Sequence, residues 1–354
     1  MLPVGGGPGE KTGCQSTAEI CQVASKLARK VDCFYIRFLR KHAMNTIRPC
    51  GCKGCRTCLL CENEFGIEKK DFFQIYKELA SYVLCPACNK IYKGWSVPEI
   101  LNNHENHVAN EGKNFPGVLV KANFITEQEG QKLMQNLDEL PWQGSQSGRR
   151  KQNYGPKTNF KKRKLQNGDF KGFPFSTKFV QEKFAAEPLL KGFQTIEQCT
   201  LEYNPDKGAS IDPHIDDCWI WGERVVTVNC LGDSVLTLAK YKGQNSKYNL
   251  DLVEGYKDKL IRKLLDEKEL DEYEDIVIRI PMPNLSLIVL YGPARYQFEH
   301  SVLREDVKER RVCLAYREFT PMYLENGKDF EKGKFVTNNA LQFWDHTTEA
   351  AIAT

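Results

Sequence analysis

The chain has 354 residues, of which 41% are hydrophobic and 27% charged, a balance typical of globular proteins that bury a core. Lysine and arginine exceed aspartate and glutamate by only 50 to 46, so the net charge does not by itself predict a nucleic-acid partner. No apolar run approaches the ~20 residues of a membrane span, and no signal peptide is visible. We therefore expect a protein of the cytoplasm and nucleus, where its 14 cysteines stay reduced.

Residues 1–45 are rich in glycine and then basic. We expect this segment to be disordered or specific to one isoform, because Met44 stands just before the first cysteines and is a candidate for the true or an alternative start. The alternative is a genuine flexible terminus, since the ends of a domain are commonly unordered unless they are tied down.

Residues 46–110 contain seven cysteines and two histidines and are predicted to form a separate, small, metal-binding region. Four thiolates at close spacing suit a zinc ion or an iron–sulfur cluster. A cluster of reduced thiols without a metal is the alternative. Five cysteines lie within twelve residues, so that one of them is spare: Cys50, Cys52, Cys55, Cys58 and Cys61.

Cys85, Cys88, His104 and His107 form a second candidate zinc site. Two cysteines followed by two histidines are typical of a zinc finger, but the gap of fifteen residues and the tight His-x-x-His depart from its usual spacing. In the alternative interpretation the histidines are exposed on a helix, and the thiols pack or join the first cluster.

Residues 111–320 have the pattern of a folded enzyme domain. A strand is expected near residues 115–120. A helix is expected over 126–140, because Thr126 and Glu129 have capping-box spacing and apolar residues recur with a period near 3.6. A second helix is expected at 176–190.

Eight basic residues crowd positions 149–164, between the two predicted helices. They include Arg149, Arg150 and Lys151, and Tyr154 is interleaved with them. Basic and aromatic side chains suit contacts with phosphates and bases, but they suit an acidic protein surface equally well. We expect residues 144–172 to form a loop, with a purely solvated segment as the alternative.

Short β-rich runs separated by turn residues follow and predict an α+β fold, in which helices support a barrel or jelly roll. The eight runs are 199–203, 211–216, 224–230, 235–239, 276–280, 285–291, 298–303 and 311–319. Residues 241–274 are charged, with leucines at helical spacing, and are expected to be an insertion between strands. Residues 321–354 form a weakly patterned tail.

His214, Asp216 and His300 offer two imidazoles and one carboxylate, a ligand set that suits non-haem Fe(II) in oxygenases. Residues two apart in a strand point to the same side, so His214 and Asp216 are both expected to face the barrel interior. His300 lies in a later predicted strand and completes the set. Three protein ligands leave positions open for a co-substrate and O2. Without a metal, three polar side chains in a barrel core would need other partners.

Arg311 and Arg317 follow the second histidine and, being six apart, face the same side of a regular strand. A planar guanidinium meets a carboxylate with two parallel hydrogen bonds. An iron site followed by two such groups predicts a 2-oxoglutarate-dependent oxygenase, in which the arginines hold the two ends of the diacid.

These motifs resemble the AlkB family of Fe(II)/2-oxoglutarate dioxygenases over about residues 115–320, and are most similar to the subfamily of the fourth animal homologue. The matching stretches are EYNP at 202–205, HID at 214–216, SLIVL at 286–290, ARY at 294–296 and RVCLAYR at 311–317, with GCKG at 51–54, GRRKQ at 148–152 and WIWGER at 219–224.

The resemblance implies a double-stranded β-helix with a defined set of functional residues. Iron would lie on His214, Asp216 and His300, and 2-oxoglutarate on Arg311, Arg317 and the hydroxyl of Tyr203. A lid over the substrate would include Arg149, Arg150, Lys151 and Tyr154. Because Cys55 departs from the subfamily, the first N-terminal metal set would be Cys50, Cys52, Cys58 and Cys61.

Four residues depart from the family pattern. Leu201 stands where many members have asparagine, and Cys313 and Ala315 stand where repair members have asparagine and threonine, so some polar contacts with the co-substrate are altered. Cys218 occupies a position where repair members carry an acidic residue that contacts a damaged base. This last departure argues against repair of alkylated bases.

The resemblance implies oxidative N-demethylation, which consumes O2 and 2-oxoglutarate and releases formaldehyde, succinate and CO2. Two substrates remain open. One is monomethyl-lysine in protein, where the subfamily implies actin and actomyosin processes. The other is N6-methyladenine in DNA, which the basic segment and a zinc finger would suit. A non-catalytic scaffold and a hydroxylase with a stable product are further alternatives. No membrane partner is expected, and the sequence leaves the oligomeric state open.

Overall fold

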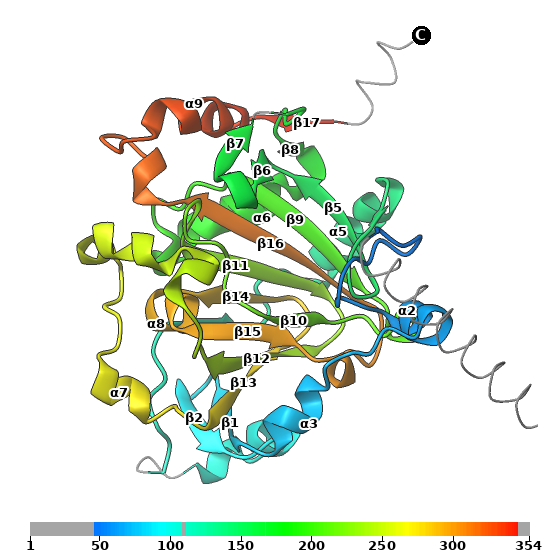
Figure 1. The fold of residues 1–354 in the computed structure, drawn as a ribbon, viewed down its shortest axis with the longest axis vertical. Helices are drawn as coiled ribbons and strands as arrows, with labels where there is room; N and C mark the ends of the chain where they lie inside the picture. The colour runs from blue at the N-terminus through cyan, green and yellow to red at the C-terminus, as the bar shows by residue number, and fades with distance from the viewer. Residues whose placement is uncertain (1–45, 108–110, 167, 346–354) are drawn as a thin grey trace, which may run out of the picture.

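The computed structural model describes residues 46–107, 111–166 and 168–345, and two β-sheets dominate them (Figure 1). The predictions for residues 1–45 and for the last nine residues of the tail lie outside the described residues. The seven-stranded sheet has the order β3 (Val118–Lys121), β14 (Ser286–Leu290), β11 (Trp221–Leu231), β16 (Arg311–Phe319), β9 (Glu197–Tyr203), β5 (Arg149–Tyr154) and β4 (Gln143–Gly144). The six-stranded sheet has the order β10 (Ile211–His214), β15 (Phe298–Val302), β12 (Ser234–Lys240), β13 (Ile276–Met282), β1 (Ala80–Cys85) and β2 (Lys90–Lys93).

All eight predicted runs between 199 and 319 form strands, β9 to β16. Along the chain they alternate between the two sheets, except that β12 and β13 are neighbours in one sheet. The pairs among these eight strands are antiparallel. The predicted α+β class is therefore confirmed. One boundary is wrong: β10 ends at His214, where its register is irregular and Pro213 has no N–H for the ladder, so Asp216 lies beyond the strand.

Apolar side chains from both sheets form one core between the sheets. Tyr203, Val225 and Ile288 enter it from the seven-stranded sheet, and Leu238 and Ile278 enter it from the six-stranded sheet. Because each sheet buries this inner face, the side chains that alternate along β9 to β16 have fixed directions.

Helices cover the outer face of the seven-stranded sheet (Figure 1). The predicted capping box is present at the start of α5 (Glu127–Glu139), where Thr126 and Glu129 each accept a hydrogen bond from the other's backbone N–H. Leu133 and Leu137 on the buried side of this helix share a core with Val226 of β11. The prediction of this helix is confirmed.

The second predicted helix is shorter than expected. Only α6 (Lys178–Lys183) is α-helical within 176–190. Proline at position 188 cannot continue a helix, so the chain forms short 3-10 turns around α6 instead. These are η3 (Phe175–Thr177), η4 (Phe184–Ala186) and η5 (Pro188–Leu190).

The cysteine-rich region is not separate from the enzyme core. Strand β1 pairs in parallel with β13, from Ala80 opposite Ile276 to Val83 opposite Arg279, so the β1–β2 hairpin extends the six-stranded sheet. An isolated hairpin is marginal in water, and the sheet supplies the missing support. The other elements of this region are α2 (Leu59–Phe65), α3 (Phe72–Lys77), α4 (Val97–Asn102) and η1 (His104–Asn106).

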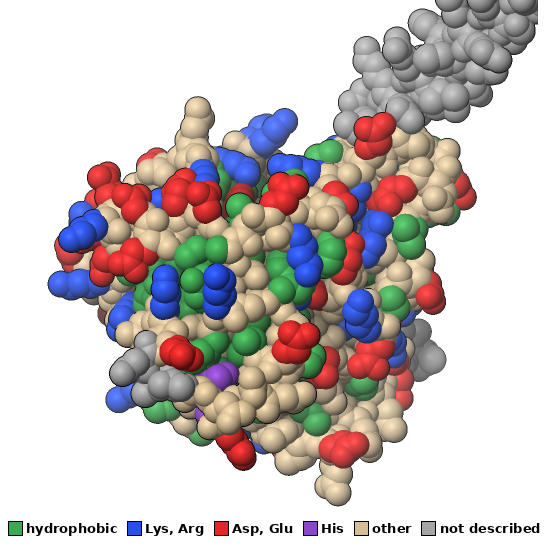
Figure 2. Space-filling model, turned by 90° about the horizontal axis from the view of Figure 1, so that it is seen from below, with side chains coloured by type: hydrophobic (Ala, Val, Ile, Leu, Met, Phe, Trp, Pro, Cys, Tyr) green, Lys and Arg blue, Asp and Glu red, His purple; other side chains and the backbone are tan. Residues whose placement is uncertain are grey.

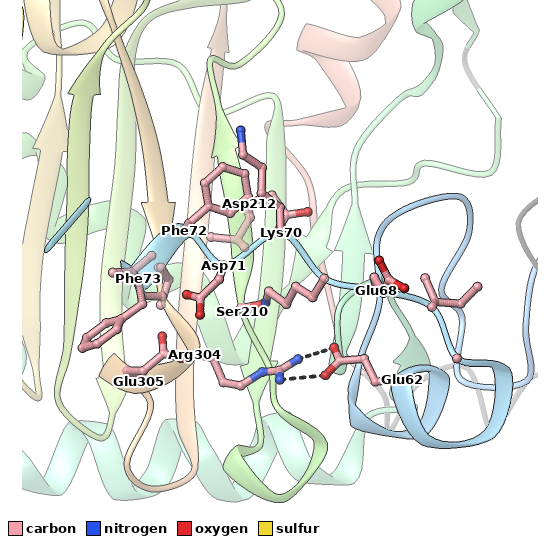
Figure 3. Close-up of a pocket in the computed structure, with 16 residues that line it drawn as sticks. Glu62, Glu68, Lys70, Asp71, Phe72, Phe73, Ser210, Asp212, Arg304 and Glu305 are labelled. Carbon is pink, nitrogen blue, oxygen red and sulfur yellow. Dashed lines mark hydrogen bonds and ion pairs between the residues drawn. The ribbon is translucent and has the colours of Figure 1, made fainter. Parts of the chain in front are cut away.

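A cavity of about 490 Å³ lies where this region crosses the barrel (Figure 3). Glu62 of α2 forms two hydrogen bonds, of 2.6 and 2.9 Å, with Arg304 of η10 (Arg304–Asp306). The half-buried Lys69 ammonium donates to the hydroxyl of Ser210. The lining includes none of the predicted iron ligands. Its residues come from both the cysteine-rich region and the barrel, so the cavity lies at the contact between the two.

The segment predicted as a basic loop contains three strands. The first, β5, pairs with β9 and carries Arg149, Arg150 and Lys151 near the edge of the seven-stranded sheet. The other basic residues, 157–164, lie in a separate two-stranded hairpin. In the described part of the tail, β17 (Phe343–Trp344) pairs in parallel with β8 (Phe173–Pro174). The remaining elements are β6 (Lys157–Asn159), η2 (Phe160–Lys162), β7 (Lys164–Gln166), η11 (Pro321–Tyr323) and α9 (Phe330–Asn339).

The 241–274 insertion forms short helical elements, and the three leucines predicted at helical spacing, Leu260, Leu264 and Leu265, do not lie on a helix. Leu260 and Leu264 fall between two helical elements and pack in one cluster with Ile215, Cys218 and Tyr256. The insertion therefore covers the segment next to Asp216. Its elements are η7 (Asn245–Tyr248), η8 (Leu250–Gly255), η9 (Lys257–Lys259) and α7 (Glu267–Asp271), and the short α8 (Gly292–Tyr296) precedes β15.

The surface and the helices bear on possible partners. Among the described residues, no helix has the length and apolar character to traverse a bilayer. On the face shown in Figure 2, basic and acidic side chains are interspersed, so neither sign of charge dominates there. Strong electrostatic binding of nucleic acid needs a surface whose charges are mostly positive, and this face does not have one.

Replacing Leu137 by alanine tests the packing of α5 on the sheet. Leu137 is fully buried, so the substitution leaves a cavity, and we expect the free energy of unfolding to fall by about 2–5 kcal/mol. Gln135→Ala on the exposed side of the same helix is the control and should change it by less than about 0.5 kcal/mol. Chemical denaturation of both variants measures the difference, and equal effects would contradict this packing.

Candidate active site

Strand pairing brings the three predicted iron ligands together. His214 at the end of β10 lies directly opposite His300 of β15, and their ring centroids are 4.3 Å apart. Asp216 follows on the loop, with its Oδ1 3.7 Å from Nε2 of His214. One ligand atom from each residue lies within 4.8 Å of the other two. The structure thus brings together the three residues that the sequence singled out as iron ligands.

Hydrogen bonding and burial set the protonation of these three groups. Nδ1 of His214 lies 2.9 Å from the carbonyl oxygen of Asp212 and donates to it, which leaves Nε2 with its lone pair. Burial lowers the pKa of both histidines, most strongly that of His300. Burial alone would raise the pKa of Asp216, but the Arg317 guanidinium holds that pKa well below its usual range. At neutral pH the set is therefore two neutral imidazoles and a carboxylate, the protonation state that binds a metal.

These residues fit a ferrous ion. Nδ1 of His300 is buried and has no hydrogen-bond partner among the described residues. Asp216 shares the single guanidinium of Arg317 with Glu197, so a cation at Asp216 would add to a compensation that two carboxylates divide. Two histidines and one carboxylate are the donors of non-haem Fe(II) sites that keep open positions. The predicted assignment of His214, Asp216 and His300 as iron ligands rests on this geometry.

Arg311 is a buried cation with an unused donor. It is 1% exposed, its Nε donates to Oδ1 of Asn229 at 2.8 Å, and its guanidinium lies 4.7 Å from the ring centroid of Tyr203. Nη1 is buried without a hydrogen-bond partner in the described part of the chain. A buried guanidinium in this state calls for an anionic ligand. A carboxylate of 2-oxoglutarate, the predicted ligand, meets that requirement.

Arg317 is engaged differently. Its Nε and Nη2 donate to the two carboxylate oxygens of Asp216 at 2.8 and 3.2 Å, and its Nη1 donates to Glu197 at 2.6 Å. We expected Arg311 and Arg317 to hold the two ends of a diacid in the same way. The structure instead gives Arg317 a contact with the metal-binding carboxylate and leaves the unused buried donor on Arg311.

Sequence reasoning missed Glu197 and Asn229. Glu197 lies opposite Arg317 in the β9–β16 pairing, and Asn229 lies in β11, where its side-chain N–H groups also hold the carbonyls of Gly232 and Met282. Both residues act through strand register, which follows from which strands pair. For Asn229 the only signal was a polar residue inside the predicted strand 224–230, and Glu197 precedes the predicted strand 199–203, so no signal marked it.

A cavity of about 1260 Å³ opens beside the Arg317–Glu197 pair. The residues around it come from β5, the β6–β7 hairpin and β17. They include Lys151, Tyr154, Phe160, Glu197 and Trp344. We call this cavity the substrate groove. Its lining includes none of the predicted iron ligands, but Glu197 connects it to Asp216 through Arg317, which binds both carboxylates. Part of the basic segment predicted as a lid also lines it.

The four predicted lid residues separate into two groups. Lys151 and Tyr154 line the substrate groove. Arg150 is held away from it by Glu202, with Nη2 donating to Oε1 at 2.7 Å, while the guanidinium of Arg149 lies 5.8 Å from the ring centroid of Tyr203. Arg149 thus belongs with the co-substrate pocket, and Arg150 has a structural role on the outer side of the sheet.

Within each of the two predicted cysteine-rich metal sets, the structure brings the four ligands together. One ligand atom from each member of a set lies within 4.8 Å of the others. Cys55 stays exposed and outside, and so is the spare cysteine of the first five. The sets are Cys50, Cys52, Cys58 and Cys61, and Cys85, Cys88, His104 and His107.

Comparison with known proteins identifies the family. No protein-family model matches the sequence. A human protein named "Alpha-ketoglutarate-dependent dioxygenase alkB homolog 4" is 36% identical over 84% of this chain and 95% of its own length. The mouse protein of the same name is 35% identical over 85% of this chain and 96% of its own. The chain belongs to the AlkB family of 2-oxoglutarate-dependent dioxygenases.

A relative from Caenorhabditis elegans named "DNA N6-methyl adenine demethylase" is 30% identical over 80% of this chain and 91% of its own length. Among solved structures, a Pseudomonas putida prolyl-4-hydroxylase aligns with a TM-score of 0.32, 12% identity and coverage of 64% of this chain and 98% of that one. OsALKBH1 aligns with a TM-score of 0.37, 10% identity and coverage of 58% and 97%. These scores are too low to support an argument, so the fold rests on the strand pairing.

Family membership confirms two predictions. The protein is a dioxygenase that depends on 2-oxoglutarate, and its cofactors are Fe(II), 2-oxoglutarate and O2. Which residues hold each cofactor stays a prediction, supported by the convergence of His214, Asp216 and His300 and by the unused donor of Arg311.

His214→Ala and Asp216→Ala test the iron ligands. Each removes one of three donors, so we expect iron binding to fall sharply and turnover to be abolished. The measurements are iron content and succinate release by the purified, iron-loaded variants. Glu299→Gln is the control, because its side chain faces Lys247 and Tyr248. Succinate production retained by either ligand variant would overturn the assignment.

Arg311→Met tests the co-substrate pocket. Removing the charged partner of a bound carboxylate costs about 2–5 kcal/mol, so the Kd for 2-oxoglutarate should rise roughly 30-fold or more. The control is Arg310→Met, because the neighbouring guanidinium pairs with Asp138 and Glu202 on the outer side. Calorimetric titration of both variants gives the two Kd values, and an unchanged Kd for Arg311→Met would remove the residue from the pocket.

Proposed function

We propose that this protein is an oxidative N-demethylase whose core is a double-stranded β-helix. Eight antiparallel strands that alternate between two facing sheets support the proposed core. The observation that carries the activity is that one core holds both a three-donor metal set and Arg311, a buried cation whose Nη1 has no hydrogen-bond partner among the described residues. Tyr203, whose ring lies beside Arg311, and Leu238, which pairs with His300, belong to that core. An oxygenase of this class needs both features side by side.

The protein's own residues would position the reactants. His214, Asp216 and His300 would hold Fe(II), Arg311 with Tyr203 would hold 2-oxoglutarate, and Arg317 would keep Asp216 ionised and oriented. Bound iron supplies the oxidation, in which 2-oxoglutarate and O2 give succinate and CO2 while an N-methyl group is hydroxylated and then lost as formaldehyde.

We propose monomethyl-lysine in a protein as the substrate, with actin as the candidate that the subfamily resemblance implies. A methyl-lysine side chain carries a positive charge at neutral pH. The carboxylate of Glu197 lines the substrate groove and also contacts Arg317, so it stands where a methylammonium group would enter. Cys218 is fully buried with its sulfur 3.7 Å from Nη1 of Arg295, so this position presents no acid to a damaged base.

N6-methyladenine in DNA is the second candidate. The C. elegans relative is named for that activity. The groove is also lined by lysines and by aromatic rings that suit phosphates and bases: Lys151, Lys157, Lys161, Tyr154 and Phe160. Against it stands the acidic Glu197 at the inner end of the same groove, which is unfavourable for a polyanion.

The compartment follows from the chemistry of the cysteines. We propose that the enzyme acts in the cytoplasm and nucleus, where thiols stay reduced. All eleven cysteines of the described residues are free in the structure, which suits such a location. Regulation of actomyosin would follow if actin is the substrate.

Formaldehyde and succinate release distinguish the two substrates. We expect turnover with a monomethyl-lysine actin peptide and little with an N6-methyladenine oligonucleotide of the same concentration. Binding of the peptide should vary little with salt, whereas phosphate-driven binding falls steeply between 50 and 200 mM salt by roughly 10³-fold or more when several phosphates are contacted. The unmethylated peptide and oligonucleotide are the controls. Turnover confined to the oligonucleotide, with a steep salt response, would reverse the assignment.

A further inference from the structure

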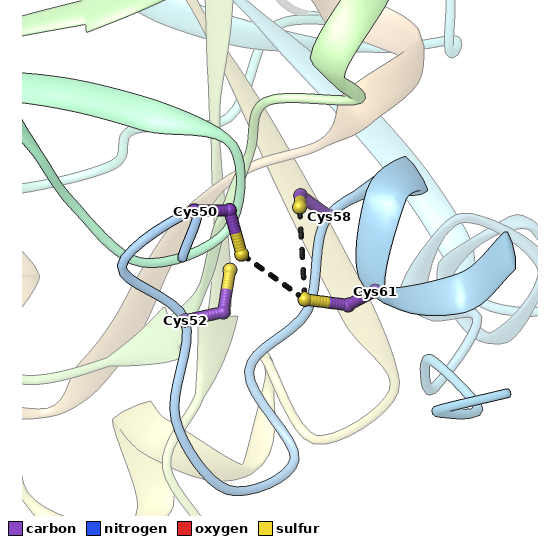
Figure 4. A group of neighbouring side chains, drawn as sticks. All are labelled: Cys50, Cys52, Cys58 and Cys61. Atoms are coloured by element: carbon purple, nitrogen blue, oxygen red, sulfur yellow. Dashed lines mark hydrogen bonds between the residues drawn. The ribbon is translucent and has the colours of Figure 1, made fainter. Parts of the chain in front are cut away.

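Four cysteine sulfurs converge in the N-terminal region, outside the active site (Figure 4). Cys50 and Cys52 come from a loop, Cys58 is the N-cap of α2, and Cys61 lies in the first turn of that helix. The sulfur of Cys61 is 3.2 Å from that of Cys50 and 3.8 Å from that of Cys58. These separations are too long for a disulfide of ~2.05 Å. A tetrahedral zinc with ~2.3 Å bonds places its sulfurs ~3.8 Å apart, so the second separation matches that distance and the first is shorter than it.

We propose that Cys50, Cys52, Cys58 and Cys61 bind one structural zinc ion that fastens the N-terminal region to the rim of the active site. Four protein ligands leave no open position, so the ion has a structural role. An iron–sulfur cluster places its cysteines on different iron atoms and so separates some of their sulfurs more widely. Here one sulfur atom of each cysteine lies within 4.8 Å of all the others, which favours a single ion.

The surroundings of the four sulfurs suit negatively charged thiolates. Arg48 is 3% exposed, and its Nε donates to the sulfur of Cys61 at 3.0 Å. The backbone N–H of Ser147 donates to the sulfur of Cys52 at 3.2 Å. Such donors orient metal ligands and offset the excess negative charge of four thiolates around a dication. Three of the four cysteines are almost fully buried.

One side of this site is fixed to the turn that begins β5. Ser147 donates to Cys52, and Arg56 donates to the side chain of Gln146. Gly51 has a φ of +89°, and a Cβ there would lie 2.9 Å from the carbonyl carbon of Gly144, so only glycine permits the contact. The turn leads directly into Arg149, whose guanidinium lies against the Tyr203 ring. The zinc site would thus position a residue of the co-substrate pocket.

The other side is fixed to the loop before β10. Glu62 of α2 binds Arg304, and Nε of Arg304 donates to the carbonyl oxygen of Gly208 at 3.1 Å. Residues 208–210 lead into the strand that ends at His214. The zinc site would therefore connect the N-terminal region to two chain segments. One is the turn before β5, which leads to the co-substrate pocket, and the other is the loop before β10, which leads to the iron ligands.

A second cluster supports a second zinc ion independently. Nδ1 of His104 lies 3.2 Å from the sulfur of Cys88 and 3.6 Å from that of Cys85, and Nδ1 of His107 lies 3.3 Å from the sulfur of Cys88. The ring of Tyr92 stacks on His107 at 3.7 Å between centroids. The ligands come from a β-hairpin and the helical segment after it, as in a zinc finger. Because β1 pairs with β13, we infer that this ion is structural and holds the hairpin in the barrel sheet.

Metal content and X-ray absorption at the zinc edge test both sites in the full chain. We expect about two zinc ions per chain, with sulfur neighbours at ~2.3 Å as the dominant shell. The iron set contains no sulfur ligand, so adventitious zinc there cannot reproduce that signal. Purified protein that lacks tightly bound zinc, or that shows the absorption of an iron–sulfur cluster, would overturn the proposal.

Cysteine variants separate the two sites and provide a matched control. Cys52→Ala should lose one zinc and its sulfur ligands while retaining the mixed sulfur–nitrogen site, and Cys88→Ala should do the reverse. Cys55→Ala should retain both ions, because Cys55 is exposed and lies outside the cluster. Loss of zinc from Cys55→Ala equal to that from Cys52→Ala would contradict the ligand set. If Cys52→Ala does not fold, stepwise chelation of the wild-type protein, followed by Co(II) reconstitution and its tetrahedral thiolate spectrum, decides the same question.

Hydrogen exchange tests the fastening role. After selective loss of the four-cysteine zinc, exchange should quicken in residues 144–154 and 204–214 while α5 stays protected. Exchange that quickens equally throughout the chain would indicate only a general loss of stability. Exchange unchanged in both segments would overturn the fastening role.

Discussion

The pairing of β10 with β15 sets His214 opposite His300, and the rest of the active site is arranged around that pair. The third donor, Asp216, lies on a loop and has no strand partner to fix it. Two other features hold it: the guanidinium of Arg317 binds both carboxylate oxygens, and the neighbouring Ile215 is buried in a cluster with residues of the 241–274 insertion. The insertion that interrupts the barrel sequence therefore supports the loop that carries the carboxylate.

The balance of buried charge explains why the two arginines differ. Arg317 stands between two carboxylates, Asp216 and Glu197, so its charge is compensated within the protein. Arg311 has an amide, a thioether and an aromatic ring as neighbours and keeps one donor unused. Burying such a cation costs stability that only an anionic ligand recovers. A site built in this way binds its dianionic co-substrate without reorganising, because the compensating charge is already in place.

Sequence patterns predicted the parts of the molecule that depend on local spacing. The eight strands, the capping box of α5 and the convergence of His214, Asp216 and His300 all follow from periodicity or residue type. Two failures were local, because Pro188 follows the shortened second helix and Pro213 lies where β10 ends. The other failures depend on partners distant in the sequence. The basic segment has strand character because β9 is available to pair with it, and the β1–β2 hairpin joins the barrel because β13 has a free edge. Glu197 and Asn229 belong to the site because of how β9, β11 and β16 are aligned with one another. No local sequence pattern encodes that alignment.

The segments that build the substrate groove lie largely outside the ligand motifs shared by the family. Trp344 reaches the groove because β17 pairs with β8 across 170 residues of chain. Lys151 and Tyr154 lie on β5, at the sheet edge whose preceding turn contacts the N-terminal cysteine site. The iron and co-substrate residues determine the reaction, and these peripheral segments determine what can approach it. The choice between the two proposed substrates, a protein side chain and a nucleobase, would therefore be made by charge and shape at the groove and not at the metal.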